Sequence, residues 1–268
     1  MHRWTVLMAV LLLPFTTCGD LERSSDTTPE PVNPGTPQEF IDRIDTAMVR
    51  DQQVLQMTVE ASGHEGDEAP EGLWRNEIWI YAAEEQARHL FHLGPHGTDD
   101  IPAQTIFVID GNRTYSHSQN GTTDVTEGLP ARTCPQVETP LLIHHAFGAF
   151  CSRFVPQDGE ANELTARLDE DAEFDGTPAV ALVYEARNEL ESGATPEPER
   201  LPDLTLASFY LDPESWLPLG WTVEMQDEST DLQLEIMAAY SSQFIPREQL
   251  PDDFFDPPTI DQSTETAP

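Results

Sequence analysis

Three consecutive strand-like segments constrain the fold of this 268-residue chain most strongly. They span residues 204–211, 217–225 and 231–240, and short turns rich in Asp, Glu and Ser separate them. Within the second segment, Trp221 and Val223 alternate with polar residues. A period of two places one face of each strand in water and the other in a core, so the pattern predicts an antiparallel meander.

The turn between the first two of these strands carries a motif. An aromatic strand, residues 209–211, continues into Asp212-Pro213-Glu214-Ser215-Trp216 and a return strand that begins Leu217-Pro218-Leu219. This hairpin resembles the "aromatic strand, Asp-Pro-Glu-Thr-Gly-Leu-Pro, return strand" hairpin of the lipoprotein-carrier superfamily, with Ser215-Trp216 in place of Thr-Gly. A second hairpin, Asp110-Gly111-Asn112 followed by Tyr115, is similar to the Asp-Gly-Lys hairpin that these carriers place in mid-sheet.

The superfamily includes LolA/LolB-like carriers, LppX/LprG-like mycobacterial lipoproteins and the N-terminal domain of RseB/MucB-like envelope sensors. The resemblance implies an α+β fold. A strongly curved antiparallel sheet, a half-barrel of about 8–11 strands, would carry an N-terminal helix and an internal helix as lid or plug.

The resemblance also implies an apolar cavity for acyl chains on the concave face of the sheet. The residues expected to line this ligand cavity are Leu55, Met57, Val59, Ile78, Ile80, Phe107, Ile109, Phe147, Phe209, Leu211, Trp221, Val223 and Leu234. An ordinary packed core is the alternative interpretation of the same side chains.

Residues 36–50 predict the N-terminal helix. Thr36 is an N-cap residue, Pro37 occupies the first helical position, and Glu39 completes a capping box. Apolar residues at helical spacing follow, and the period changes to two from Leu55 onward. The helix therefore leads directly into a strand.

The charge balance argues against some classes of partner. The chain has 49 acidic residues against 13 basic ones, a formal net charge of −36. Such a field repels phosphate backbones and anionic headgroups, so nucleic-acid binding is not expected and stable membrane association needs a hydrophobic or covalent anchor. The acidity fits a strongly solvated surface better than an acidic docking patch.

The amino terminus predicts such an anchor. His2-Arg3 precedes an apolar run, residues 4–13, that is too short to span a bilayer but fits a secretory signal. Pro14-Phe15-Thr16-Thr17-Cys18 resembles a bacterial lipobox, in which Cys18 becomes the first mature residue and carries acyl chains such as palmitate. Cleavage of an ordinary signal peptide near Thr17, or an uncleaved anchor, stays open.

Four parts of the chain follow from these features: a signal peptide (1–17), a lipidated Cys with a disordered tether (18–35), a LolA-like domain (36–245) and a C-terminal tail (246–268). The tether and tail are polar and rich in proline, so they bury too little apolar surface to fold. Phe254 and Phe255 are expected to pin the tail to the domain. Residues 63–72 and those after Tyr240 are predicted to be loops.

Cys134 and Cys151 remain for one disulfide once Cys18 is assigned to lipidation in an exported chain. Between them, residues 138–150 predict a helix that is apolar on most sides. Such a helix suits a plug or lid lying in the concavity of a sheet.

Signals for catalysis and for metal or cofactor binding are weak. The chain has no nucleophile elbow, phosphate loop or Cys-x-x-Cys, so we expect no enzyme and no cofactor. His144 and His145 are neighbours on the predicted helix and point about 100° apart, so they cannot share a metal. His89, His92 and His96 fall in a predicted strand and loop, and no metal site is expected there.

Two functions fit these features. The first is a membrane-anchored lipoprotein of the cell envelope, facing outside the cytoplasm, that binds or transports lipid or lipoprotein acyl chains. The alternative is a non-enzymatic regulatory or sensor module of RseB type that binds an envelope partner protein. A carrier predicts a continuous cavity, whereas a sensor predicts a filled core and an exposed apolar patch.

Overall fold

The computed structural model describes residues 35–65, 71–93, 105–119, 121–128, 134–140, 142–143, 150–151, 154–157, 160–188, 202–227 and 232–257. Cys18, Phe147, His96, His144 and His145 lie outside these residues, as does the predicted signal peptide. Within the described part of the chain, no helix has both the length and the hydropathy needed to cross a bilayer.

Helix α1, Pro37–Met48, precedes the sheet and has the predicted capping box. The Glu39 backbone N–H donates to Thr36 Oγ1 at 3.2 Å, and the Thr36 backbone N–H donates to Glu39 Oε2 at 3.0 Å. One face of the helix, formed by Phe40, Ile41, Ile44 and Met48, is buried. The helix ends two residues before the predicted boundary because Val49 is already extended.

Eleven strands follow and form one sheet. They are β1 (Gln53–Glu65), β2 (Glu71–Tyr81), β3 (Gln86–Leu93), β4 (Thr105–Asp110), β5 (Arg113–Ser118), β6 (Thr123–Glu127), β7 (Glu163–Phe174), β8 (Thr177–Arg187), β9 (Leu204–Leu211), β10 (Pro218–Asp227) and β11 (Leu232–Pro246). Two short 3₁₀ turns, η1 (Ala82–Glu84) and η2 (Arg247–Gln249), lie at strand ends.

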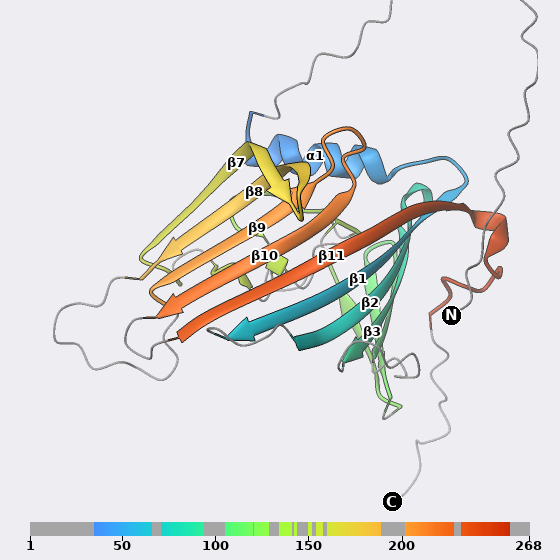
Figure 1. Ribbon diagram of the computed structural model, residues 1–268. Helices are drawn as coiled ribbons and strands as arrows, with labels where there is room; N and C mark the ends of the chain where they lie inside the picture. Colours follow the sequence, from blue (N-terminus) through green and yellow to red (C-terminus); the bar gives the residue numbers. More distant parts are fainter. Residues whose placement is uncertain are drawn as a thin grey trace, which may run out of the picture. The chain divides into compact units, whose positions relative to one another are not determined.

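The sheet is antiparallel throughout, curved and open (Figure 1). Its strand order is β6-β5-β4-β3-β2-β1-β11-β10-β9-β8-β7, so two meanders meet where the first and last strands pair. That central pairing runs from Gln53 opposite Pro246 to Glu65 opposite Leu234. The structure therefore confirms the predicted α+β half-barrel, with 11 strands.

The central pairing also corrects two predictions. Residues 63–72 are not a loop throughout, because β1 continues to Glu65 and β2 begins at Glu71. Residues 241–246 are not loop or tail, because they extend β11 along β1. Polar residues in Ser241-Ser242-Gln243 interrupt the apolar alternation, so the period-two signal ends before the strand does.

Alternation along the strands gives the sheet a continuous apolar concave face. In one row across the sheet, Phe209 pairs with Trp221, Trp221 with Ala238, Ala238 with Ala61, and Ala61 with Trp74. All five side chains belong to one buried cluster that includes the buried face of α1. The core of the protein thus lies between α1 and the concave face.

A second apolar cluster lies on the outer face of β1 and β2. Phe254 meets Trp79 edge to face, with ring centroids 5.4 Å apart, and Phe255 stacks on Tyr81 at 6.3 Å. Arg88 Nη1 donates to the Phe254 carbonyl at 2.7 Å. Phe254 and Phe255 thus pin the segment after η2 to the sheet, as the sequence predicts.

Candidate functional site

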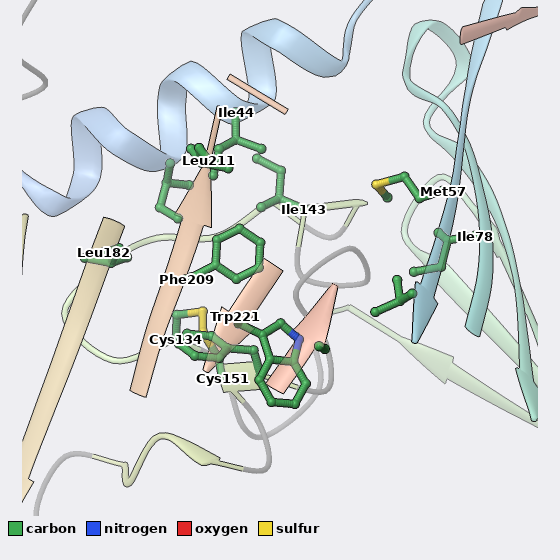
Figure 2. Close-up of a cluster of buried hydrophobic side chains, with 14 of the residues drawn as sticks. Ile44, Met57, Ile78, Cys134, Ile143, Cys151, Leu182, Phe209, Leu211 and Trp221 are labelled. Carbon is green, nitrogen blue, oxygen red and sulfur yellow. A yellow bond between two sulfur atoms is a disulfide. The ribbon is translucent and has the colours of Figure 1, made fainter. Parts of the chain in front are cut away.

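The described residues of the predicted ligand cavity all lie on the concave face or its edge. They are Leu55, Met57, Val59, Ile78, Ile80, Phe107, Ile109, Phe209, Leu211, Trp221, Val223 and Leu234. Phe107 and Leu234 are half-buried and the others are buried. Figure 2 shows Met57 and Ile78 projecting from β1 and β2 toward the interior that also holds Phe209 and Trp221.

A disulfide-closed segment covers one part of this face. Cys134 and Cys151 form the predicted disulfide, with Cα atoms 4.9 Å apart. Phe150 packs on Phe209 and Trp221, with ring centroids 5.5 and 6.1 Å apart, and Phe154 lies 5.0 Å from the Trp221 ring. Leu142, Ile143, Phe150, Cys151 and Phe154 have helical backbone conformation. We call the described residues between 134 and 155 the plug, since they fill the concave face over β8–β10.

Hydrogen bonds to α1, β7 and β8 hold the start of the plug in place. Gln38 on α1 makes two hydrogen bonds to the backbone of Glu138: its Nε2 donates to the carbonyl at 3.1 Å, and its Oε1 accepts from the N–H at 2.8 Å. The buried Tyr184 hydroxyl donates to the Pro135 carbonyl at 3.0 Å. Gln136 Nε2 donates to the Leu164 carbonyl at 3.1 Å.

The concave face is less covered over β3–β5. His89 and Phe91 on β3, Phe107 on β4 and Ser116 on β5 point to this face and are only half-buried. The His89 and Phe107 rings lie 5.4 Å apart. The face therefore changes from a fully buried aromatic core under the plug to a half-exposed mixture of aromatic and polar side chains.

Three polar side chains lie within the apolar part of the concave face. Asn76 is 4% exposed and lies between Val59 and Phe91 in the ladder. Ser242 faces the concavity beside Met57. Burial raises the pKa of the Tyr240 phenol well above its usual value, so this hydroxyl stays neutral. None of the three is predicted as a site residue from the sequence, although Asn76 occupies an inward position in the alternation of β2.

The described residues show no arrangement suited to a metal ion. His89 and His92 lie on opposite faces of β3 because they are three residues apart on a strand. His64 pairs with Glu235 at 3.6 Å, and His117 Nδ1 lies 2.8 Å from Thr123 Oγ1.

A separate surface pocket of about 570 Å³ lies beside the start of β1 and the ends of β2 and β11. Its lining is polar and includes Asp51, Glu84, Arg247 and Asp252. The Arg247 guanidinium already donates to the carbonyls of Leu250, Pro251 and Asp252. An acyl chain would gain little here, since the apolar lining is small.

No protein-family model matches the chain, and no curated protein matches it in sequence. Solved structures do resemble it in fold. An uncharacterized conserved protein from Thermus thermophilus is 12% identical, with 81% of this chain and 94% of that one covered and a TM-score of 0.38. A LolA superfamily protein from Nitrosomonas europaea is 12% identical, with 82% and 97% covered and a TM-score of 0.33.

The complex of MucA and MucB from Pseudomonas aeruginosa is also similar, at 17% identity, with 76% of this chain and 56% of that one covered and a TM-score of 0.35. LolA superfamily proteins and MucB, both expected from the hairpin resemblance, are thus among the structures to which this chain is similar.

Proposed function

We propose that this protein is a non-enzymatic lipoprotein of the bacterial cell envelope that binds lipid, or the acyl chains of lipoproteins, on the concave face of its half-barrel. Acyl chains on Cys18 would hold it at a membrane surface, outside the cytoplasm. With a net charge of −36, a covalent anchor supplies the membrane affinity that the folded domain lacks.

One observation carries the proposal: the apolar concave face does not end where the plug ends. It continues from the buried Met57 and Ile78 to the half-buried Phe91 and Phe107. An acyl chain laid along this surface would remove its methylenes from water, which stabilises binding by about 0.8 kcal/mol per methylene. Such binding needs no polar constellation of the kind that catalysis requires.

A different observation favours the second candidate function, a sensor that binds an envelope partner protein. The concave face over β8–β10 is already filled, because Phe150 and Phe154 pack directly on Trp221. The plug is also tied at both ends by the Cys134–Cys151 disulfide. A filled core of this kind suits a module that presents its surface to a protein.

Native mass spectrometry separates the two functions. The full chain with Cys18→Ser, expressed without lipidation, is purified from a membrane-free extract and sprayed with and without prior organic extraction. The carrier function predicts co-purifying lipid that is released on denaturation and reduced by Phe107→Glu. An apo mass that stays apo after incubation with total membrane lipid contradicts it and favours the sensor.

A further inference from the structure

Asn76 is a buried polar residue on the concave face. It lies on β2 between Trp74 and Ile78, which both belong to the buried core. Its cross-strand neighbours are Val59 on β1 and Phe91 on β3. Alternation along β2 points all three side chains, Trp74, Asn76 and Ile78, into the concavity.

The Asn76 Oδ1 atom is enclosed and has no hydrogen-bond partner. Buried amides are nearly always hydrogen-bonded, because an unpaired one loses its bonds to water and gains nothing in return. A Leu at position 76 has the same number of side-chain heavy atoms and would not carry this cost. The unpaired Oδ1 therefore costs folding free energy, and a ligand that donates a hydrogen bond to it would remove that cost.

A second atom of the same kind lies on the other side of β1. Ser242 on β11 pairs with Met57, and its Oγ is also enclosed without a hydrogen-bond partner. Strand spacing and pleat place the two residues roughly 12 Å apart. Apolar Met57 and Val59 lie between them, so this stretch of apolar surface has a polar atom on each side.

Asn76 also marks a boundary on the concave face. Phe91, its neighbour on β3, is half-buried, and the ladder continues to Thr105 on β4 and Ser118 on β5, both half-buried. On the other side, Val59 and Trp221 are buried. An acyl ligand can approach Asn76 only from this half-buried side, so its polar head would lie toward β3–β5.

We infer that Asn76 accepts a hydrogen bond from the head of a bound acyl ligand, from a hydroxyl or amide N–H close to the start of the chain. The inference rests on the proposed function and narrows its ligand class. Lipids with a hydrogen-bond donor beside the acyl linkage bind in preference to plain esters of the same size.

Two probes with the same heavy-atom count test this preference. In 2-hydroxyethyl palmitate the terminal hydroxyl is a donor, and propyl palmitate has a methyl group in its place. The change in intrinsic tryptophan fluorescence during titration reports binding to the full chain with Cys18→Ser. One net hydrogen bond predicts that the hydroxyl probe binds about two- to tenfold more tightly.

Asn76→Leu should remove that preference, leave propyl palmitate bound at least as tightly, and raise the Tm. Asn76→Ala is a second test, because it removes the amide without placing a larger apolar side chain in the site. The matched control is Ile245→Leu, which changes a side chain of the outer cluster to one of the same volume and should keep the preference.

Different failures have different meanings. Equal binding of both probes to the Cys18→Ser chain, or a preference that survives in both Asn76 variants, overturns the role of Asn76 and leaves lipid binding standing. Binding of neither probe overturns the proposed function and this inference with it.

Discussion

The Arg43 guanidinium lies over the Trp216 ring, 4.8 Å from its centroid. Trp216 also meets Phe40 edge to face at 6.4 Å, so the β9–β10 turn holds α1 through an aromatic ring. The Trp216 backbone has a φ of +59°, which lies in the left-handed region that favours glycine. Trp216 thus combines a strained backbone conformation with a contact to the helix.

Replacing Trp216 should separate these two effects. Trp216→Ala loses the contacts with Arg43 and Phe40 and keeps the strained backbone, so the free energy of unfolding should fall by about 1–2 kcal/mol. Trp216→Gly loses the same contacts but relieves the left-handed strain of about 1 kcal/mol. Urea unfolding should therefore rank wild type above Gly and Gly above Ala. An Ala variant as stable as the Gly variant would contradict this account of the turn.

The disulfide should contribute strongly to the stability of the plug. Cys134 and Cys151 are 17 residues apart, and closing a loop of that length stabilises a fold by about 3 kcal/mol. Cys134→Ser with Cys151→Ser should lower the free energy of unfolding by that order and speed hydrogen exchange at the Glu138 amide. Gln38→Ala, which removes the two hydrogen bonds to Glu138, should speed that exchange with a smaller loss of stability. Unchanged exchange in both variants would show that the plug is held by other contacts.

Gly220 should not tolerate a methyl group. A Cβ at this position would overlap Phe174 Cζ and lie 2.5 Å from the Ala238 carbonyl oxygen. Gly220→Ala should thus cost about 1–3 kcal/mol in urea unfolding. Phe174→Leu in the same chain should restore only part of the loss, because the backbone contact remains. Full rescue would show that the clash involves Phe174 alone and not the Ala238 carbonyl oxygen.

Alkaline pH should destabilise the protein through Tyr240. Burial raises the folded-state pKa of its phenol above the ordinary value of 10.0. Below pH 10 both states keep the proton, and above it the unfolded chain loses the proton first, so stability falls by up to about 1.4 kcal/mol per pH unit. The chain has no lysine, so no ammonium side chain titrates in this pH range. Tyr240→Phe should flatten the loss of stability above pH 10 in urea titrations, and an unchanged slope would contradict the burial.

Much of the fold is predictable because its signals are local. The alternation around Trp221 and the capping box at Thr36 are encoded within a few residues, and both predictions are confirmed. The pairing of β1 with β11 is not local, since it joins residues such as Gln53 and Pro246. Periodicity cannot specify such a partner, and the part of β11 beyond Tyr240 has no apolar alternation that would predict a strand.

The candidate site is predictable only in part. Inward positions such as Met57 and Ile78 follow from alternation, and the structure places them on the concave face. The unpaired state of Asn76 does not follow from sequence, because it depends on what lies opposite the amide in three dimensions. Likewise, the Gln38 side chain bonds the backbone of Glu138, 100 residues further along the chain, and helical periodicity cannot specify such a contact.

The most direct test of acyl-chain binding is photo-crosslinking. A palmitate ester with a diazirine in mid-chain is irradiated with the full Cys18→Ser chain, and crosslinked peptides are mapped by mass spectrometry. Our account predicts crosslinks on concave-face residues of β1–β4, including Met57 and Phe107, that excess 2-hydroxyethyl palmitate displaces. Crosslinks confined to the outer cluster around Trp79 and Phe254, or none above background, would contradict it.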